Sequence, residues 1–125
     1  MNIPQGYQTV MPYLIIRNAD QFFDWMQQVF GATEKMRVNN EDGSLMHGEL
    51  QIDDNNTIMY GQASAEWGEN TGGFFIYVAD ADATYQKALD KGASSLMEMS
   101  DRDYGRTGGV KDPFGNTWWI TTHVN

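Results

Sequence analysis

The spacing of apolar side chains changes along the first 31 residues, and each spacing predicts one element. Residues 10–17 are mainly apolar and β-branched, which predicts a strand. In residues 21–30 the apolar side chains recur three and four positions apart, which predicts an amphipathic helix. Asn18 or Asp20 can cap the beginning of this helix, and Gly31 can end it. Its apolar stripe comprises Phe22, Trp25, Met26, Val29 and Phe30.

The remainder of the first half alternates short apolar runs with polar turns. Strands are predicted over residues 34–38, 45–52 and 57–61, because turn-forming residues separate these runs. The first half therefore has the predicted order β-α-β-β-β. Residues 63–72 are small, polar and glycine-containing, which is typical of a linker.

The second half predicts the same order. Residues 73–78 form a predicted strand, and a helix that begins at Asp80 or Asp82 runs to Lys91. Tyr85, Ala88 and Leu89 are expected to face inward from this helix. A strand over residues 93–99 precedes a long glycine-bearing loop, 100–109, which merges into a further strand. A turn at residues 112–115 and a last strand at 117–123 complete the half.

Two recurring dipeptides support a duplicated arrangement. Gly31-Ala32 recurs 61 residues later at Gly92-Ala93, and Asn56-Thr57 recurs 60 residues later at Asn116-Thr117. A half of this size has too small a core to be stable alone, so the halves are expected to pack together. We therefore predict a single domain of residues 1–125, with modules at about 9–62 and 73–124 and a linker at about 63–72.

Composition excludes several classes of protein. The 125-residue chain has a formal net charge of -9, which disfavours nucleic-acid partners. It has no cysteine, which excludes disulfides, thiolate metal sites and cysteine nucleophiles. It shows neither a signal-peptide pattern nor an apolar run of the roughly 20 residues that a membrane span needs. We therefore expect a cytoplasmic protein without a membrane partner.

Three segments resemble one known family. They are Pro12-Tyr13-Leu14 leading to Phe30-Gly31-Ala32, then 46–50 (Met-His-Gly-Glu-Leu), and the run 108–119. With the paired modules, they resemble the vicinal oxygen chelate superfamily, which includes glyoxalase I, bleomycin-resistance proteins and extradiol dioxygenases. The small stand-alone PhnB-like, glyoxalase-like branch is the most similar. The resemblance implies an α+β fold, in which two tandem βαβββ modules form a cupped mixed sheet with helices on its outer face.

The resemblance also implies four metal-ligand positions, one on the first and last strand of each module. These positions fall at or beside Met11, Met59, Gly73 and Trp119, and neither these residues nor their neighbours supply His, Asp or Glu. We therefore expect no metal at that centre and no other cofactor. Glyoxalase I chemistry, which requires the metal, is not expected there.

His47 and Glu49 are two residues apart on a predicted strand, so they share a face. They either line the cup as ligand contacts or an acid–base pair, or lie on the solvated side of the strand. His123 could join them in a displaced metal site, or could be an ordinary surface histidine. Catalytic residues are therefore unassigned, with His47 and Glu49 as the candidates.

Further residues are candidates for ligand binding. Aromatic side chains at or near the ligand positions favour a stacking pocket, although ordinary core packing also explains them. Arg106, in the predicted glycine-bearing loop, could bind a carboxylate or phosphate of a ligand, or form a salt bridge to a nearby acid. Trp67, in the linker, could be a lid, a dimer contact or an anchor. The full ligand-binding set is Tyr13, His47, Glu49, Met59, Phe75, Tyr77, Arg106 and Trp119.

Three functional hypotheses follow. The first is a metal-independent small-molecule binder with an aromatic-lined cup, acting as a homodimer; the acidic composition is compatible with a cationic ligand. The second is an isomerase or lyase that uses His47 and Glu49 as an acid–base pair, or a displaced divalent metal. The third is an interaction domain without a ligand, which solid packing of Tyr13, Tyr77 and Trp119 would favour.

Overall fold

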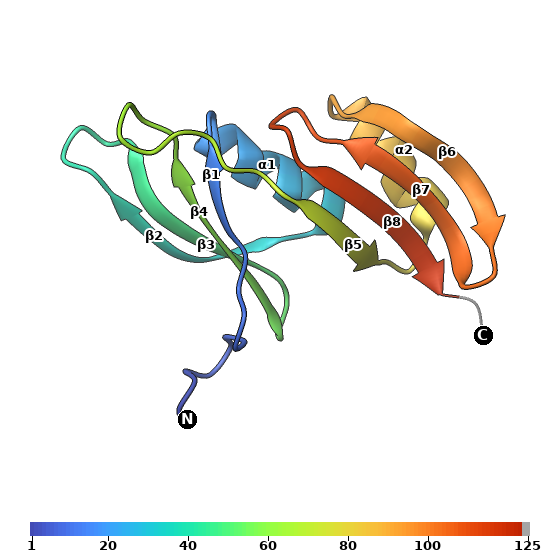
Figure 1. The fold of residues 1–125 in the computed structure, drawn as a ribbon, viewed down its shortest axis with the longest axis horizontal. Helices are drawn as coiled ribbons and strands as arrows, with labels where there is room; N and C mark the ends of the chain where they lie inside the picture. The colour runs from blue at the N-terminus through green and yellow to red at the C-terminus, as the bar shows by residue number, and fades with distance from the viewer. Residues whose placement is uncertain (124–125) are drawn as a thin grey trace. The chain divides into compact units, whose positions relative to one another are not determined.

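The computed structural model describes residues 1–123 and divides into two compact units, 1–70 and the chain from Thr71 onward. Each unit contains one helix and one four-stranded mixed sheet (Figure 1). The predicted order β-α-β-β-β is confirmed in both units. Within residues 1–123, no helix has the length and apolar character that a membrane span requires.

The first unit contains β1 (Tyr13–Ile16), α1 (Ala19–Phe30), β2 (Thr33–Asn39), β3 (Leu45–Asp53) and β4 (Asn56–Gln62). Its strands lie in the order β1-β4-β3-β2. The pair β1–β4 is parallel, whereas β2–β3 and β3–β4 are antiparallel. The long connection from β1 to β4 thus includes the helix and two strands, which places the first strand beside the last.

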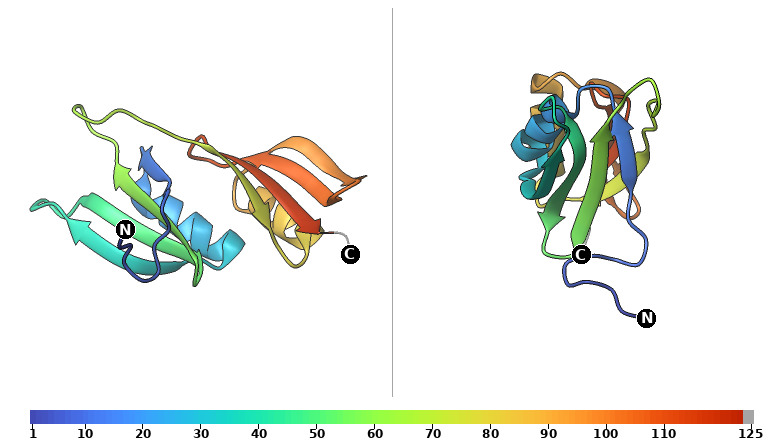
Figure 2. Two further views of the ribbon diagram at one scale, coloured as in Figure 1. Left: turned by 60° about the horizontal axis from the view of Figure 1, so that its bottom comes forward. Right: turned by 90° about the vertical axis from the view of Figure 1, so that its left-hand side faces the viewer.

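The second unit repeats this topology. It contains β5 (Gly73–Tyr77), α2 (Ala81–Asp90), β6 (Ser94–Arg102), β7 (Gly105–Lys111) and β8 (Thr117–His123). The order is β5-β8-β7-β6, again with a parallel pair, β5–β8, joining the first and last strands. Figure 2 shows one helix against one face of each sheet, so each sheet has a helix face and an open face.

Alternation along the strands separates these two faces. In the first unit, Leu14 and Tyr60 are partners across β1 and β4 and are buried on the helix face. The ring of Phe22 from α1 meets the Tyr60 ring edge-on, with centroids 5.4 Å apart. In the second unit, Trp118 and Ile120 of β8 are buried on the corresponding face.

The beginning of α1 differs from the predicted capping. The Asn18 side chain forms no cap hydrogen bond. The backbone N–H of Ala19 instead donates to Oε1 of Gln62, at 3.0 Å, from the end of β4. The predicted C-terminal stop is confirmed, because Gly31 adopts the left-handed conformation with φ of 72°. In α2, Asp80 is the cap, and its side chain accepts from the N–H of Ala83.

The predicted loop over residues 100–109 is wrong. Strand β6 continues to Arg102, a turn follows at Asp103 and Tyr104, and β7 begins at Gly105. The glycines that suggested a loop are strand residues against which neighbouring atoms pack closely, the Thr122 carbonyl at Gly105, the Met99 sulfur at Gly108 and the Trp119 ring at Gly109. A Cβ on Gly109 would lie 2.3 Å from the Trp119 ring, and one on Gly108 would lie 3.1 Å from Tyr85.

The first strand is also shorter than predicted, because β1 begins at Tyr13 rather than at residue 10. Pro12 lacks an N–H, so it cannot donate a ladder hydrogen bond. Its carbonyl oxygen still accepts from the N–H of Met59, at 3.0 Å, just before the strand begins.

The turn between β7 and β8 is organised by Asp112, a buried carboxylate. One carboxylate oxygen accepts from the backbone N–H groups of Phe114 and Asn116, each at 2.9 Å. The other accepts from the Asn116 side-chain amide and from the indole N–H of Trp118, also at 2.9 Å. This residue therefore joins the turn to the core tryptophan that follows it.

Candidate functional site

The open face of the first sheet brings together four of the predicted site residues. Met59 of β4 is the register partner of both Tyr13 on β1 and Glu49 on β3. His47 lies two residues before Glu49 on β3 and so shares its face. Strand pairing thus places Tyr13, His47, Glu49 and Met59 on one surface, on the side away from α1.

Three of these residues form a hydrogen-bonded array with a residue that the sequence did not suggest. The Tyr13 hydroxyl lies 2.9 Å from Nδ1 of His47, and Nε2 of His47 lies 2.7 Å from Oε2 of Glu49. The hydroxyl of Tyr7 donates to Oε1 of Glu49. Both imidazole nitrogens and both carboxylate oxygens therefore have partners. We call this set, Tyr7, Tyr13, His47 and Glu49, the polar array.

Glu49 is a buried acid whose environment favours its ionised form. Only 3% of the residue is exposed. Burial alone would raise the pKa of its carboxyl, but the hydrogen bonds from Tyr7 and His47 and nearby positive charge outweigh burial, and the pKa lies below its ordinary value. Conversely, the hydrogen bond to Glu49, assisted by burial, raises the pKa of the Tyr7 hydroxyl. In the pair Tyr7–Glu49, the neutral phenol is therefore the donor and the ionised carboxylate is the acceptor.

The N-terminal segment, residues 1–11, covers Glu49 because it is attached to β4. The Gln8 side chain donates to the Thr57 carbonyl oxygen at 2.9 Å and accepts from the Thr57 N–H at 3.2 Å. The Thr57 hydroxyl donates to the carbonyl oxygen of Gly6 at 2.7 Å. The Lys35 ammonium lies 4.4 Å from the centroid of the Tyr7 ring. These contacts join residues more than 25 positions apart, so no local sequence signal identifies them.

Two hollows open on the first unit. The larger has a volume of about 980 Å³, and its wall includes Tyr13, Met46 and Trp67. The predicted linker tryptophan, Trp67, is 63% exposed there, and a turn with Ser64 holds its backbone. The smaller hollow, of about 560 Å³, lies between the N-terminal segment and the sheet, with Glu49 and Met59 in its wall. Both volumes are in the range of small-molecule sites.

The open face of the second sheet is aromatic. Phe75 and Trp119 are register partners on β5 and β8, and Tyr77 lies two residues after Phe75. They are 48%, 37% and 60% exposed, respectively. The Phe75 and Tyr77 rings meet edge-on with centroids 5.2 Å apart, and the Tyr104 ring lies 6.0 Å from Phe75. These side chains form an exposed surface, which we call the aromatic face: Phe75, Tyr77, Tyr104 and Trp119.

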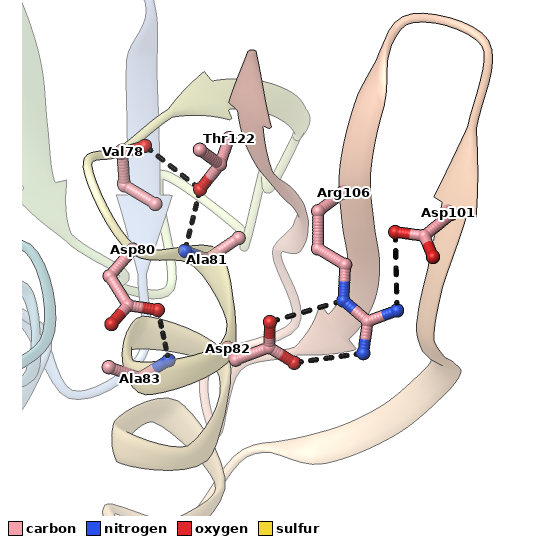
Figure 3. Close-up of polar contacts among 8 residues, drawn as sticks. All are labelled: Val78, Asp80, Ala81, Asp82, Ala83, Asp101, Arg106 and Thr122. Atoms are coloured by element: carbon pink, nitrogen blue, oxygen red, sulfur yellow. Dashed lines mark hydrogen bonds and ion pairs between the residues drawn. The ribbon is translucent and has the colours of Figure 1, made fainter. Parts of the chain in front are cut away.

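Arg106 does not join the aromatic face. On β7 it is the partner of Thr122, whose hydroxyl accepts from the N–H of Ala81 at the beginning of α2. Figure 3 shows the guanidinium between two acids, Asp82 of α2 and Asp101 of β6. Both hydrogen bonds to Asp82 are 3.1 Å, and the nearest distance to Asp101 is 3.5 Å. Of the acids near it in the sequence that were available for a salt bridge, Asp101, Asp103 and Asp112, only Asp101 is an observed partner; Asp82, 24 residues away, is the other.

The four metal-ligand positions implied by the resemblance do not fit a metal ion. Met11 and Met59 line the smaller hollow, Gly73 is the partner of Thr117, and Trp119 lies on the aromatic face. Among residues 1–123, no three His, Cys, Asp or Glu side chains gather as metal ligands would. The His123 ring lies 6.1 Å from Tyr77. A displaced site shared by His47 and His123 stays a prediction.

Comparisons with known proteins identify the family. The model of the "Glyoxalase/Bleomycin resistance protein/Dioxygenase superfamily" matches residues 8–120. The uncharacterized protein Mb0911c of Mycobacterium bovis is 31% identical over 118 residues, covering 86% of this chain and 78% of that relative.

Solved structures show the same fold. TioX from Micromonospora sp. ML1 superposes with a TM-score of 0.73 and 22% identity, covering 94% of this chain and all of that one (100%). TnmS3, an antibiotic binding protein from Streptomyces sp. CB03234, superposes with a TM-score of 0.72 and 12% identity, covering 99% of both chains. The family-model match over residues 8–120, with the 31% identical relative, shows that the chain belongs to the glyoxalase/bleomycin resistance protein/dioxygenase superfamily.

Proposed function

We propose that this protein binds a small molecule on the open faces of its sheets, without a metal. The observation that supports this most directly is the aromatic face. Phe75, Tyr77 and Trp119 are 37–60% exposed, whereas Trp118 and Ile120, on the other face of the same sheet, are buried. Exposed aromatic surface is a common feature of ligand sites, because a ligand that covers it removes a large apolar area from water, which is energetically favourable.

Other observations agree with this proposal. Tyr13, Tyr77 and Trp119 remain exposed, so the solid packing that would favour an interaction domain without a ligand is not seen at these residues. TnmS3, a protein of the same fold, is described as an antibiotic binding protein. The net charge of -9 favours cationic ligands. The cytoplasmic homodimer expected from the sequence is part of the proposal, and size-exclusion chromatography with light scattering tests the dimer.

A thermal-shift screen that includes cationic glycopeptides and other drug-like cations tests the binding function. Hits are then titrated by calorimetry against Trp119→Ala, Phe75→Ala and Gln86→Ala. We expect the first two substitutions to weaken binding by about ten-fold or more, since each removes aromatic contact area. Gln86 is an exposed control on α2, on the opposite side of the second sheet from the aromatic face, so Gln86→Ala should bind normally. A stoichiometric divalent ion in the purified protein, or loss of binding after chelation, would contradict the metal-free proposal.

The polar array favours a second candidate, an isomerase or lyase with His47 as the proton-transfer group. Glu49 is a weak base because its pKa is lowered, so its role there is to orient the imidazole from 2.7 Å. The test is proton exchange at carbon in deuterated water, followed by NMR for a panel of α-hydroxy and α-keto compounds. Exchange that His47→Gln abolishes would support the enzyme. An absence of exchange across the panel would favour the binding protein.

A further inference from the structure

The smaller hollow of the first unit combines an apolar wall with one buried acid. Its volume is about 560 Å³, and the apolar residues in its wall are Met1, Ile3, Pro4, Met11 and Met59. Glu49 lies in the same wall and is 3% exposed. Asn2, Gln8 and Thr9 also line it, so Glu49 is the one ionisable carboxylate in a wall of mixed apolar and neutral polar side chains. A few polar groups in such a wall fix the orientation of a ligand.

The Glu49 carboxylate retains hydrogen-bonding capacity. Oε1 accepts from Tyr7 and Oε2 is paired with Nε2 of His47, so each oxygen has one partner in the polar array. A carboxylate oxygen can accept two hydrogen bonds. By lone-pair count, each oxygen therefore retains one acceptor position beyond its hydrogen bond to Tyr7 or His47.

Glu49 forms no ion pair with a Lys or Arg side chain within residues 1–123, and the charge of Lys35 acts on it only from a greater distance. Within residues 1–123, its sole ion pair is with His47, and that pair is ionic only when the imidazole is protonated. The nearby Lys35 ammonium lies over the Tyr7 ring. Residues 1–70 contain ten acidic and three basic side chains, so the surrounding field also favours a cation.

We propose that this hollow binds an amphipathic amine. The ammonium group donates to the Glu49 carboxylate, and the hydrocarbon body lies against Met11, Met59 and the N-terminal segment. This inference rests on the proposed small-molecule binding and names the ligand class of one site. A charged hydrogen bond in a partly dehydrated site is stronger than a neutral one, so a neutral molecule of the same shape should bind less well.

The test uses a matched pair of probes, phenylbutylamine and phenylbutanol, which differ in the charged head group. Calorimetry gives their affinities, and amide NMR shifts locate the site. We expect the amine to bind the unmodified protein at least about ten-fold more tightly than the alcohol. The perturbed amides should lie in residues 3–11, 47–50 and 57–60.

Two variants separate the buried charge from the overall field. Glu49→Gln removes the charge from the hollow and should weaken amine binding about ten-fold or more, with little effect on the alcohol. Glu41→Gln removes one charge from the exposed turn between β2 and β3 and should leave both affinities unchanged. Because the probe comparison needs only the unmodified protein, instability of Glu49→Gln would not prevent the test.

Equal affinities of amine and alcohol for the unmodified protein would overturn the inference. So would amine binding that Glu49→Gln leaves unchanged, or amine-induced shifts confined to the aromatic face. In the latter case small-molecule binding itself would stand, and only its assignment to this hollow would fail. Absence of binding by these probes and by the whole cationic screen would reject both proposals.

Discussion

Nε2 of His47 lies 2.7 Å from Oε2 of Glu49, a buried carboxylate two positions further along the same strand. The spacing in the sequence puts both side chains on one face of β3. The contact also depends on the N-terminal segment, because Tyr7 binds the other carboxylate oxygen. Proton binding at this site is therefore connected to the stability of the fold.

The first prediction concerns acid stability. The pKa of Glu49 is lower in the folded protein than in the unfolded chain, because donors from Tyr7 and His47, with the charge of Lys35, outweigh its burial. Its stabilising contribution is therefore present above the unfolded pKa of about 4.3 and is lost as the pH falls through the folded value. Glu49→Gln should lower the free energy of unfolding by about 1–3 kcal/mol near neutral pH.

Urea unfolding at a series of pH values measures this effect. The difference between the unmodified protein and Glu49→Gln should shrink as the pH falls below about 4. Glu41→Gln, with its side chain in an exposed turn, provides the control. A difference that stays constant down to the acid transition would show that ionisation of Glu49 does not stabilise the fold.

The second prediction concerns the β7–β8 turn. Asp112→Ala removes the acceptor of four donors: two backbone N–H groups, an amide and the Trp118 indole. Since buried donors would be left without it, we expect a loss of about 3–5 kcal/mol in the free energy of unfolding. Chemical unfolding measures the loss. Asp103→Ala, in the exposed β6–β7 turn, should cost less than about 0.5 kcal/mol, and an equal loss would contradict this explanation.

The third prediction uses a glycine pair. A Cβ at Gly109 would lie 2.3 Å from the Trp119 ring, whereas a Cβ at Gly73 would meet nothing within 4 Å. Gly109→Ala should therefore displace Trp119, shift the tryptophan fluorescence and lower stability by about 1–3 kcal/mol. Gly73→Ala should leave the fluorescence spectrum unchanged. Unaltered fluorescence in Gly109→Ala would mean that the ring does not lie over this glycine.

The fourth prediction concerns Arg106. Its guanidinium is bound to Asp82 and Asp101 on the helix side of the second sheet. Arg106→Gln should therefore leave the affinity for any ligand of the aromatic face unchanged in calorimetry. The pair is partly exposed, so its small effect on thermal stability should diminish at high salt. A large loss of ligand affinity would instead give this arginine a binding role.

The spacing of apolar residues was sufficient to predict most helices and strands, because each of these elements buries one face and its apolar residues recur on that face. The helix ending at Gly31 and the last strand, Thr117–His123, are examples. It failed for β7, where three glycines in close contact with neighbouring strands and rings replace the apolar side chains that mark a strand. Similarly, the beginning of α1 is completed by Gln62, which is distant in the sequence.

The site could be predicted only in part. Alternation placed His47 and Glu49 on one face, but the burial of Glu49 depends on Tyr7, 42 residues away. Arg106 lies on the helix face of the second sheet because it pairs with Thr122 on β8. The sequence placed Arg106 in a loop, so it gave no strand register from which this face could be predicted. Local pattern therefore identified candidate side chains, whereas their partners came from long-range packing.

The Asp112 turn has a consequence for which residues of this chain can be changed independently. All four donors of that carboxylate come from the turn and from the adjoining core, within residues 114–118. Residues 112–118 thus close the hairpin, whereas the next residue, Trp119, already belongs to the aromatic face. The contacts of Asp112 do not involve the exposed rings of that face. Substitution of those rings can therefore alter what the open face binds while the hairpin keeps its closure.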